Sequence, residues 1–505
     1  MEVYERIKCR DLLNVVSSDP FEIVKKHIPK KGTIACSGMA GMGLPKVFPA
    51  FLAKYIEEEN EEFKLNIYTS GSAAPEFDES LARINAINRR YVYQNNPIIR
   101  EKINNGMIHY YDIWLGEFSR QLKYGFLNNV CGSIDIALIE AVKINEDGSI
   151  IASLSLDNIP LYVQLAKKII IELNTTKPSE IEGIHDIYFP QPRSPIPITM
   201  VNQRIGTSYI PCDPKKILAI IHSEAPEKEI FYGKPTVIEE RIVDNLFNFL
   251  LDEVKKGRIP KNLYPLQTGI GPIGDTIATK LIESGFSDLE IWTEVAQTGY
   301  LDALDSGKVK SLSASAFMIP SKDKKHEERF IENISEYKKS IVLRPLGITN
   351  NQELIARFNV IAMNQAIEVD IYGNVNITHV FGSNIANGVG GSGEFARAAY
   401  LSIFLLSSTT KDNKISRIVP MTTHVDVTDH DVDVIVTEYG WADLRGLSPR
   451  ERAKEIIEKC SSPEYKDELW NYFDEACRKV GGHMPHILSK AFSFHERFIK
   501  TGSMK

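Results

Sequence analysis

A glutamate at the end of a short apolar segment is the residue of this chain best suited to chemistry. Residues 289–299 read Leu-Glu-Ile-Trp-Thr-Glu-Val-Ala-Gln-Thr-Gly, a pattern that predicts a buried strand ending at Glu294. A carboxylate is costly to hold in apolar surroundings, and open α/β sheets bind ligands at the carboxyl ends of their strands. We interpret Glu294 as a nucleophile or a base. A helix cap or a salt bridge is the alternative, and this residue alone does not separate the two.

Two glycine-rich turns, residues 267–275 and 387–394, lie on either side of Glu294 in the sequence. Backbone N–H groups in such turns can approach an anion closely, and each turn precedes a predicted helix, 275–283 or 394–406. The first turn contains Gly-x-Gly-x-x-Gly, but it follows no clear strand and lacks the acidic partner of a dinucleotide site, so a plain helix start is the alternative. The second has four glycines within six residues, which favours a phosphate- or pantetheine-binding turn.

A third glycine-rich turn, residues 37–43, follows the first predicted strand. We expect it to line the same cleft from the other domain. Glu438 repeats the pattern of a carboxylate after a strand, and we predict that it lies opposite Glu294.

Residues 421–433 contain side chains that could bind a metal, among them His424, Asp426 and His430. Because side chains alternate along a strand, these residues are divided between two faces. We therefore predict no metal site.

Short β-branched segments alternate with amphipathic segments, a pattern typical of parallel or mixed sheets covered by helices on both faces. The pattern restarts near residue 225, so we predict two α/β domains, residues 1–224 and 225–505. Predicted strands include 32–37, 64–68, 134–138, 168–173, 216–221, 289–293, 366–371 and 433–437, and predicted helices include 45–58, 78–91 and 235–256.

The composition is that of a globular enzyme, with 43% hydrophobic and 25% charged residues in 505. A net charge of −7 argues against general nucleic-acid or membrane-surface binding. The six cysteines form no Cys-x-x-Cys pair, so we expect reduced thiols. The first residues lack an apolar signal core, and the longest apolar run is too short to span a bilayer. We therefore predict a cytoplasmic protein.

Four segments together resemble one known family. In order they are Trp-Thr-Glu-Val-Ala-Gln-Thr-Gly (292–299), Val-Asp-Ile-Tyr-Gly-Asn-Val-Asn (369–376), Asn-Gly-Val-Gly-Gly-Ser-Gly (387–393) and Thr-Glu-Tyr-Gly-Trp-Ala-Asp-Leu-Arg-Gly (437–446). They are similar to motifs of the acetyl-CoA hydrolase/transferase family, which are class I CoA-transferases. The most similar branch is the succinyl-CoA:acetate CoA-transferases, and the similarity extends over nearly the whole chain.

The resemblance implies two open α/β/α domains of the CoA-transferase type with the active site between them. It implies that Glu294 attacks an acyl-CoA thioester, forms a mixed anhydride and then a glutamyl-CoA thioester, from which a carboxylate takes CoA. It also implies that the amide of Asn350 and the backbone of Gly391 bind the oxyanion, and that Glu438 is a second active-site carboxylate.

Coenzyme A is then a substrate and product, and no tightly bound cofactor is expected. Lys411 would pair with a phosphate of CoA, although an ordinary surface lysine is the alternative. The resemblance implies CoA contacts at Gly269, Ile270, Gly271, Pro272, Ile273, Ile367, Asn387, Gly388, Gly391 and Lys411.

Several functions stay open at this point. A hydrolase would use the same glutamate with water as acceptor, and a CoA-binding protein without turnover is a third possibility; a nicotinamide oxidoreductase is the weakest. The expected partners are acyl-CoA, short-chain carboxylates and a second copy of the chain in a homodimer. The sequence does not name the acyl pair. No arginine for a substrate carboxylate is evident at residues 222–226, which leaves a preference for succinate open.

Overall fold

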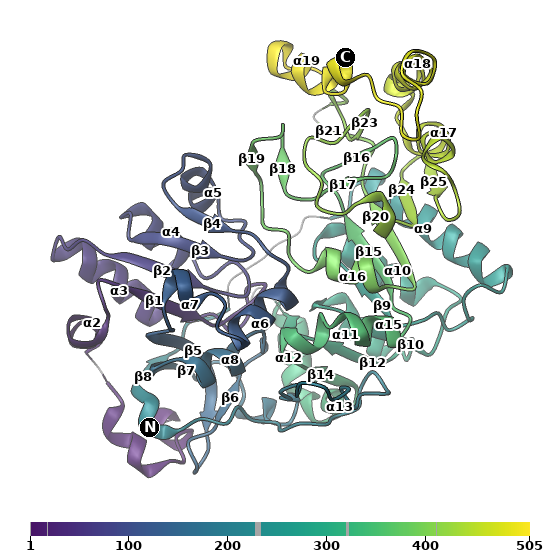
Figure 1. Cartoon of the computed structure of the whole chain (residues 1–505). Helices are drawn as coiled ribbons and strands as arrows, with labels where there is room; N and C mark the ends of the chain where they lie inside the picture. Colours follow the sequence, from purple (N-terminus) through teal and green to yellow (C-terminus); the bar gives the residue numbers. More distant parts are fainter. Residues whose placement is uncertain (1, 18, 228–233, 320–322, 411) are drawn as a thin grey trace. The chain divides into compact units, whose positions relative to one another are not determined.

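The computed structural model describes residues 2–17, 19–227, 234–319, 323–410 and 412–505 (Figure 1). The chain forms two compact units. Unit 1 comprises Met1–Phe231, Glu290–Leu304 and Val309–Leu354, and unit 2 comprises Tyr232–Leu289, Asp305–Lys308 and Ile355–Lys505. Glu294 is therefore grouped with unit 1. This grouping does not test the sequence-based boundary between residues 224 and 225, which stays a prediction.

A largely parallel sheet forms the centre of unit 1 (Figure 1). From one edge to the other its strands are β4 (His109–Tyr111), β3 (Ile87–Tyr91), β2 (Lys64–Tyr68), β1 (Lys31–Cys36), β5 (Ile136–Ile144), β7 (Lys168–Asn174) and β8 (Ile217–Ser223). A further strand, β6 (Ile150–Ala152), pairs with β5 in the antiparallel direction. From β1 the strands continue through β2 and β3 to β4 at one edge of the sheet, and from β5 they continue through β7 to β8 at the other edge. Ligands bind sheets of this kind at the carboxyl ends of the strands beside such a reversal.

Helices cover this sheet, and local signals explain where several of them begin. Asp19 and Asn96 accept backbone N–H bonds at the starts of two helices, each of which has proline as its first residue. The apolar helix faces pack on buried sheet residues such as Ile34, Leu65 and Leu138. The helices of this part are α1 (Glu2–Glu5), α2 (Pro20–His27), α3 (Val47–Glu58), α4 (Asp78–Arg83), α5 (Pro97–Asn104), α6 (Leu115–Lys123), α7 (Asn128–Cys131) and α8 (Ile159–Leu165).

The helix predicted over residues 78–91 is wrong in its second half. Helix α4 ends at Arg83, and Asn85 adopts a φ of 58°, a left-handed conformation that does not continue a helix. Strand β3 follows and pairs in parallel with β2 and β4. Periodicity alone could not reveal this, because Arg90 has the character of a surface residue yet is fully buried against Asp78.

A second group of strands in unit 1 carries Glu294. The N–H of Leu156 donates to the carbonyl of Ser315 (2.9 Å), and a bridge joins Ser155 to Ala316, so this group is attached to the loop after β6. Its strands are β10 (Leu289–Trp292), β11 (Val295–Gln297), β12 (Val309–Ala314), β13 (Ala316–Met318) and β14 (Ile341–Leu343). Its helices are α11 (Gly299–Asp305), α12 (Lys324–Glu332), α13 (Ile334–Ser340), α14 (Leu346–Thr349) and α15 (Gln352–Arg357), and the first and last of these end in unit 2.

In unit 2, five neighbouring strands follow the order β9 (Leu266–Thr268), β15 (Ile361–Gln365), β20 (Leu401–Leu405), β24 (Val434–Thr437) and β25 (Gly440–Asp443). The first four strands are parallel and β25 is antiparallel. The longest helix of this unit begins with a capping box formed by Thr236 and Glu239. The helices are α9 (Val237–Lys255), α10 (Pro272–Glu283), α16 (Ser392–Ala398), α17 (Pro449–Cys460), α18 (Pro463–Lys479) and α19 (Ser493–Thr501).

Short strands complete unit 2; in chain order they lie between β15 and β20 or between β20 and β24. They are β16 (Glu368–Asp370) with β17 (Val375–Asn376) and β23 (Ile418–Val419), β18 (His379–Val380) with β19 (Asn384–Ile385), and β21 (Thr409–Thr410) with β22 (Ile415–Ser416).

Two predictions in unit 2 are corrected by the structure. The helix predicted over residues 394–406 ends at Ala398, and the apolar run that follows is the buried strand β20, which short apolar segments cannot distinguish from helix by pattern. The glycine-rich turn at residues 269–274 does follow a strand, β9, because three residues suffice for a buried strand in this sheet.

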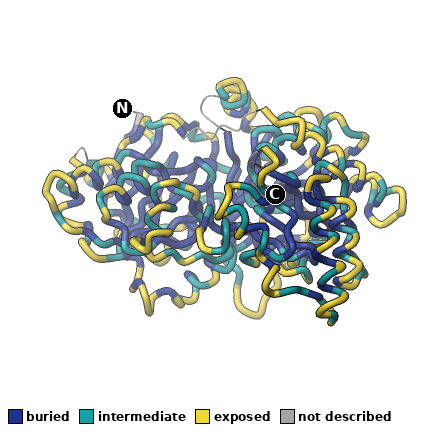
Figure 2. The backbone as a smooth tube through the Cα atoms, turned by 90° about the horizontal axis from the view of Figure 1, so that it is seen from above, coloured by how far each residue is buried: buried dark blue, intermediate teal, exposed yellow. Residues whose placement is uncertain are grey.

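Most strands of each unit are buried and form its core. Figure 2 shows buried segments in dark blue in the interior and exposed segments in yellow at the surface. The α/β class with parallel sheets, predicted from the alternation of strands and helices, is confirmed. All six cysteines are described, and none forms a disulfide. Among the helices that the structure describes, none has the length and apolar character needed to cross a membrane.

A buried ion pair ties α4 to β3 and provides a stability test. Asp78 accepts from Arg90 Nε (2.9 Å) and Nη2 (2.8 Å), and also from the N–H of Ala73 (2.9 Å). Asp78→Ala leaves the arginine buried without its carboxylate, so we expect the free energy of unfolding to fall by about 3–5 kcal/mol. The control is Glu79→Ala, which removes an exposed pair with Arg83 and should cost at most about 1 kcal/mol. Urea denaturation measures both, and equal losses would contradict the prediction.

Candidate active site

The backbone around Glu294 is held rigidly between β10 and β11. Its carbonyl accepts N–H bonds from Ser315 (2.8 Å) and Ala316 (3.3 Å), and the N–H of Thr293 donates to Ser313 (3.0 Å). The Glu294 side chain itself is only partly buried. A fixed backbone with a partly accessible carboxylate is the arrangement that a reacting group requires.

The side chain of Asn350 donates through Nδ2 to Glu294 Oε2 at 2.7 Å. The structure therefore brings together two residues that are 56 positions apart in the chain and that the sequence analysis singled out. Asn350 is buried at the end of α14, with 2% of its surface exposed. Its amide cannot turn away easily, because its surroundings are closed.

Two neighbours determine which end of the Asn350 amide faces the carboxylate. Thr349 Oγ1 donates to Asn350 Oδ1 (3.0 Å), and Trp292 Nε1 donates to the carbonyl of Thr349 (2.8 Å). With Oδ1 used as an acceptor, the NH2 group is the end that points to Glu294. Trp292 is fully buried at the end of β10, two residues before Glu294. The end of this strand therefore positions Glu294 directly and Asn350 through Thr349.

Burial raises the pKa of Glu294 to about 7, and the hydrogen bond from Asn350 opposes part of that rise. The cause is the loss of water around the charged form. A carboxylate with a raised pKa is more basic and more nucleophilic than one in water, and about half of it is ionised near neutral pH.

A buried arginine supports the tryptophan beneath this site. Arg344 lies over the ring of Trp292 at 5.5 Å and pairs with Asp186. Its Nε donates to Ser313 Oγ (3.0 Å), and a second nitrogen donates to the carbonyl of Val201 (3.1 Å). These bonds occupy the guanidinium, so its role is to position neighbouring groups.

The third glycine-rich turn, residues 37–43, is held by carboxylates. The N–H of Gly38 donates to Asp157 (3.0 Å) and that of Gly43 donates to Glu227 (3.2 Å). These two N–H groups therefore bind internal acids and not an external anion. Whether the turn lines a cleft shared with unit 2 stays a prediction.

In unit 2 the glycine-rich turn at residues 269–274 leads from β9 into α10. Gly271 has a φ of 130°, which only glycine adopts readily, and Pro272 is the first residue of the helix. Gln365 Nε2 donates to the carbonyl of Ile270 (3.3 Å), so the end of β15 holds this turn. The predicted contacts Gly269 to Ile273 thus surround a helix N-terminus, which suits an anion.

The second turn, residues 387–393, reaches the same strand end. Asn364 Nδ2 donates to the carbonyl of Ser392 (3.4 Å), one residue before Gln365 holds the first turn. The side chain of Asn387 donates to the carbonyl of Gly388 (2.9 Å). Gly391 then precedes α16, so both turns and their helices meet at the carboxyl end of β15.

Glu438 lies at the end of β24 and contacts a neighbouring loop. It accepts from the N–H (2.9 Å) and the hydroxyl (2.6 Å) of Ser408. Arg417 lies near this carboxylate and donates to the carbonyls of Ala366 and Ile367, the latter at 2.7 Å. Burial lowers the pKa of Arg417 to about 10, and the charge of Glu438 opposes this. The predicted second carboxylate thus helps to shape the segment of Ile367, while its placement opposite Glu294 stays a prediction.

The remaining predicted residue, Lys411, lies outside the described residues. In the segment 421–433, Asp426 accepts from Thr378 and from His424 (3.1 Å). Within the described ranges, no three His, Cys, Asp or Glu side chains are grouped so that they could hold a metal ion.

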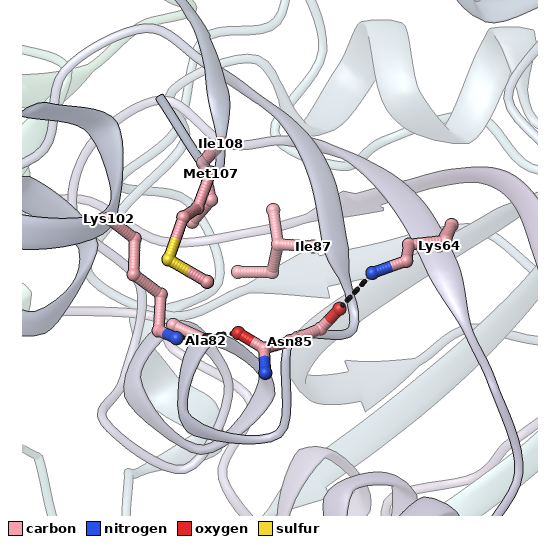
Figure 3. Close-up of a pocket in the computed structure, with 7 residues that line it drawn as sticks. All are labelled: Lys64, Ala82, Asn85, Ile87, Lys102, Met107 and Ile108. Atoms are coloured by element: carbon pink, nitrogen blue, oxygen red, sulfur yellow. Dashed lines mark hydrogen bonds between the residues drawn. The ribbon is translucent and has the colours of Figure 1, made fainter. Parts of the chain in front are cut away.

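A small pocket of about 250 Å³ lies in unit 1 at the amino ends of β2, β3 and β4 (Figure 3). Its apolar side includes Ile87 at the start of β3, and two lysines converge on Asn85. Lys64 donates to the Asn85 carbonyl (3.0 Å) and Lys102 to its side-chain oxygen (2.6 Å). Because the pocket is at the amino ends of the strands and its lysines already have partners, we do not assign it to the reaction.

Sequence reasoning missed several residues of the site. Thr349 orients Asn350, and Asn364 and Gln365 hold the two glycine-rich turns of unit 2. Asn364 and Gln365 are polar residues at the end of an apolar segment, a pattern that could have indicated them. They were missed because strand β15 itself was not predicted. Tyr93 was also missed, although its environment includes the charge of Glu294.

Comparison with known proteins found two matching family models. A model of the acetyl-CoA hydrolase/transferase N-terminal domain matches residues 18–222, and a model of the C-terminal domain of the same family matches residues 327–473.

Individual relatives cover nearly the full chain. Identity is 46% to a succinyl-CoA:acetate CoA-transferase of Clostridium kluyveri, over 94% of this chain and 87% of that protein. It is 41% to an acetyl-CoA hydrolase of Schizosaccharomyces pombe, over 99% and 98% of the two chains. It is 38% to a propanoyl-CoA:succinate CoA transferase of Escherichia coli, over 93% and 95%.

Solved structures share the fold. RipA from Yersinia pestis has a TM-score of 0.68 at 20% identity, covering 93% of this chain and 97% of that chain. A 4-hydroxybutyrate CoA-transferase from Porphyromonas gingivalis has a TM-score of 0.61 at 20% identity, covering 94% and 99%.

The environment of Glu294 predicts a pH-dependent change in stability. A carboxyl group with a raised pKa stabilises the fold below its ordinary value of 4.5 and loses that contribution as the pH rises through about 7. Glu294→Gln removes the charge and keeps an acceptor for Asn350, so we expect it to be more stable than the wild type above pH 7. The gain should be on the order of 1–3 kcal/mol and should vanish near pH 4. Thermal unfolding at several pH values measures it, and a pH-independent difference would contradict the prediction.

Proposed function

This chain belongs to the acetyl-CoA hydrolase/transferase family, and we propose that it is a CoA-transferase that moves CoA from an acyl-CoA to a short-chain carboxylate. The observation that carries the proposal is the bond of 2.7 Å between Asn350 and the partly buried, ionisable Glu294. The relatives named as transferases, at 46% and 38% identity, support transfer as the reaction. Succinyl-CoA with acetate is the first pair to test.

In the proposed reaction, a Glu294 carboxylate oxygen attacks the thioester carbonyl of acyl-CoA. The carbon–sulfur bond breaks, CoA leaves as thiolate, and a mixed anhydride forms on Glu294. The thiolate then attacks the glutamyl carbonyl, releases the acyl group as a carboxylate and leaves a glutamyl-CoA thioester. An acceptor carboxylate takes the CoA by the same steps in reverse.

Asn350 is proposed to stabilise the charge that develops in these steps. Each addition places negative charge on a carbonyl oxygen, and a fixed N–H donor lowers the energy of that oxyanion. The amide is buried, and Thr349 sets its direction, so no reorientation is needed during the reaction. A backbone donor at Gly391 stays a proposal from family resemblance.

CoA is proposed to bind unit 2 through the two glycine-rich turns. The N-terminus of α10 and the Asn387–Gly391 segment offer backbone N–H groups suited to phosphate or pantetheine oxygens. Asn364 and Gln365 hold both turns from one strand end, which keeps them in a fixed relation. Lys411 stays a proposed phosphate partner, and the homodimer and the cytoplasmic location also stay predictions.

Hydrolysis is the second candidate. Relatives named acetyl-CoA hydrolases reach 42% identity, and water could resolve the same glutamyl intermediate. The two functions differ in whether a carboxylate acceptor accelerates release of CoA from the enzyme.

A trapping experiment tests the intermediate. Incubation with acetyl-CoA followed by borohydride should reduce the glutamyl thioester at Glu294 to an alcohol and release CoA. Peptide mass spectrometry should locate the change at this residue and find none in Glu294→Gln. Adding acetate or succinate before the reductant should deplete the adduct. Rapid acetyl-CoA loss that no carboxylate accelerates would favour the hydrolase.

The pH dependence tests the ionisation of the nucleophile. Because Glu294 must be ionised to attack, we expect kcat/KM for acyl-CoA to rise with pH through about 7 and then level off. Asn350→Ala removes the bond that favours the charged form, so its profile should move to higher pH and its kcat should fall about 100-fold. Steady-state rates from pH 5 to 9 measure both effects. A wild-type profile that is flat across this range would contradict the assignment.

A further inference from the structure

The histidine- and aspartate-rich segment at residues 421–433 is bonded to the chain just before strand β18. Asp426 accepts the backbone N–H groups of Ile377 (2.6 Å) and Thr378 (2.9 Å). The hydroxyl of Thr378 lies 3.0 and 2.9 Å from the two oxygens of the same carboxylate. Only 7% of the Asp426 side chain is exposed, so little water competes for these bonds. This carboxylate therefore fixes the backbone at residues 377–378.

Residues 377–378 in turn hold the start of the second glycine-rich turn. The side chain of Asn387 donates through Nδ2 to the carbonyl of Ile377 (3.3 Å), and the N–H of Ala386 donates to the carbonyl of Thr378 (2.7 Å). The hairpin formed by β18 and β19 lies between these two contacts in the chain (Figure 1). A displacement of residues 377–378 would therefore move Asn387 and the turn that follows it.

Two histidines are bonded to this carboxylate, one directly and one through Thr378. His424 Nε2 lies 3.1 Å from Asp426, and because an ionised carboxylate only accepts, this nitrogen carries a proton. His379 Nδ1 lies 2.7 Å from the hydroxyl of Thr378, whose single proton is donated to Asp426. Nδ1 of His379 is therefore the donor in its own bond.

The two imidazole rings lie against each other. Their centroids are 3.9 Å apart and their planes are inclined by 36°. A second positive charge at this distance is repelled by the first, and Asp426 balances only one of them. Burial and the neighbouring His424 lower the pKa of His379, whereas Asp426 opposes this change.

The other neighbours of His379 contribute little charge. Strand β19, which pairs with β18, consists of uncharged residues. Asn376 donates through Nδ2 to the carbonyl of His379 (2.8 Å) and to the carboxylate of Glu368 (2.9 Å). Glu368 is itself paired with His495 (2.7 Å). His424 and Asp426 are therefore the groups whose charge acts most directly on His379.

We propose that Asp426, His379 and His424 are positioning residues of the CoA site, and that this cluster holds the second glycine-rich turn firmly only while at most one of its two rings is charged. The inference rests on the proposed function, because it takes the turn at residues 387–393 as part of the CoA site. It adds a control of CoA binding by pH.

The direction of the pH effect follows from the lowered pKa of His379. A histidine whose pKa is lowered on folding stabilises the fold above its ordinary value of 6.5, and this contribution is lost as the pH falls below 6.5. When the second ring gains its proton, repulsion favours separation of the rings and weakens the contacts of Thr378. The turn then loses its fixed position, so CoA should bind more weakly in acid.

The test measures the dissociation constant of free CoA by calorimetry at pH 7.5 and at pH 5.5. His379→Asn and His424→Gln keep a donor near the Nδ1 and Nε2 positions, but neither side chain can take a charge. Acidification should weaken CoA binding to the wild type about 5-fold more than binding to either variant. Titration of the CoA phosphate is common to all three proteins and cancels in this comparison.

Asp426→Asn tests the hold on the turn itself. The variant loses the charge and one acceptor oxygen, so the dissociation constant of CoA at pH 7.5 should rise about 10-fold. The matched controls are His430→Gln, at a side chain that is 84% exposed, and Asp252→Asn, in an exposed pair with Lys256. Neither control should change CoA affinity or its pH dependence. If Asp426→Asn does not fold, the two histidine variants decide the question.

Proton release provides a second measurement. Because CoA should bind best when His379 is neutral, binding at pH 6 should release protons from the wild type, and His379→Asn should release fewer. The heats of binding in two buffers of different ionisation enthalpy give the number released. An equal number in both proteins would contradict the role of His379.

The outcomes separate this inference from the proposed function. Equal pH dependence of CoA binding in the wild type and both histidine variants would overturn the control by pH, and unchanged CoA affinity in folded Asp426→Asn would overturn the positioning role. In either case, borohydride trapping of the Glu294 adduct in the wild type would leave the transferase standing. If the wild type binds no CoA and forms no adduct, both proposals fail.

Discussion

A carboxylate that has lost part of its water needs a rigid backbone and a donor with a fixed direction, and Glu294 has both. Its carbonyl is bonded to the segment at Ser315, and its side chain meets the amide of Asn350. The amide is oriented in turn by Thr349, whose carbonyl is held by Trp292. If any of these contacts loosened, water or a rotated amide could stabilise a different geometry, and the raised basicity of the carboxylate would be lost.

The rest of unit 1 supplies this rigidity with buried charge. Arg344 lies over Trp292 and pairs with Asp186, and Arg90 ties β3 to α4 through Asp78. Buried ion pairs contribute little net stability, but breaking one is costly, so they define a single arrangement. They also use the cations of the interior for structure.

For unit 2 we propose a different task, the binding of a large polyanion. Two glycine-rich turns and two helix N-termini meet at the end of β15, where Asn364 and Gln365 hold them. Backbone N–H groups suit phosphates and amides of many shapes, so this unit is compatible with transfer and with hydrolysis alike. The choice between the two reactions depends on how well a carboxylate competes with water for the intermediate, which is a property of the acceptor site.

The sequence alone predicted the α/β class and the family, which are confirmed, and it singled out candidate site residues, whose roles stay predictions. Glu294 and the glycine-rich turns could be predicted because a carboxylate after an apolar strand and four clustered glycines are locally costly, and the cost is visible in the residues themselves. Strand β2 was predicted at residues 64–68, as the structure has it, because its apolar alternation is local. The same local reasoning failed at residues 87–91 and 401–405, where burial by distant segments makes a strand.

Only the tertiary structure decided which residues meet. The bond between Glu294 and Asn350 spans 56 positions, and the orientation of that amide depends on Trp292 from another strand. The environment of Tyr93 is likewise a property of packing, since a tyrosine in sequence carries no sign of its neighbours. Local sequence patterns indicate the free-energy cost of placing a residue type in its own segment. Hydrogen-bond partners and the loss of hydration depend instead on segments that are far away in the chain.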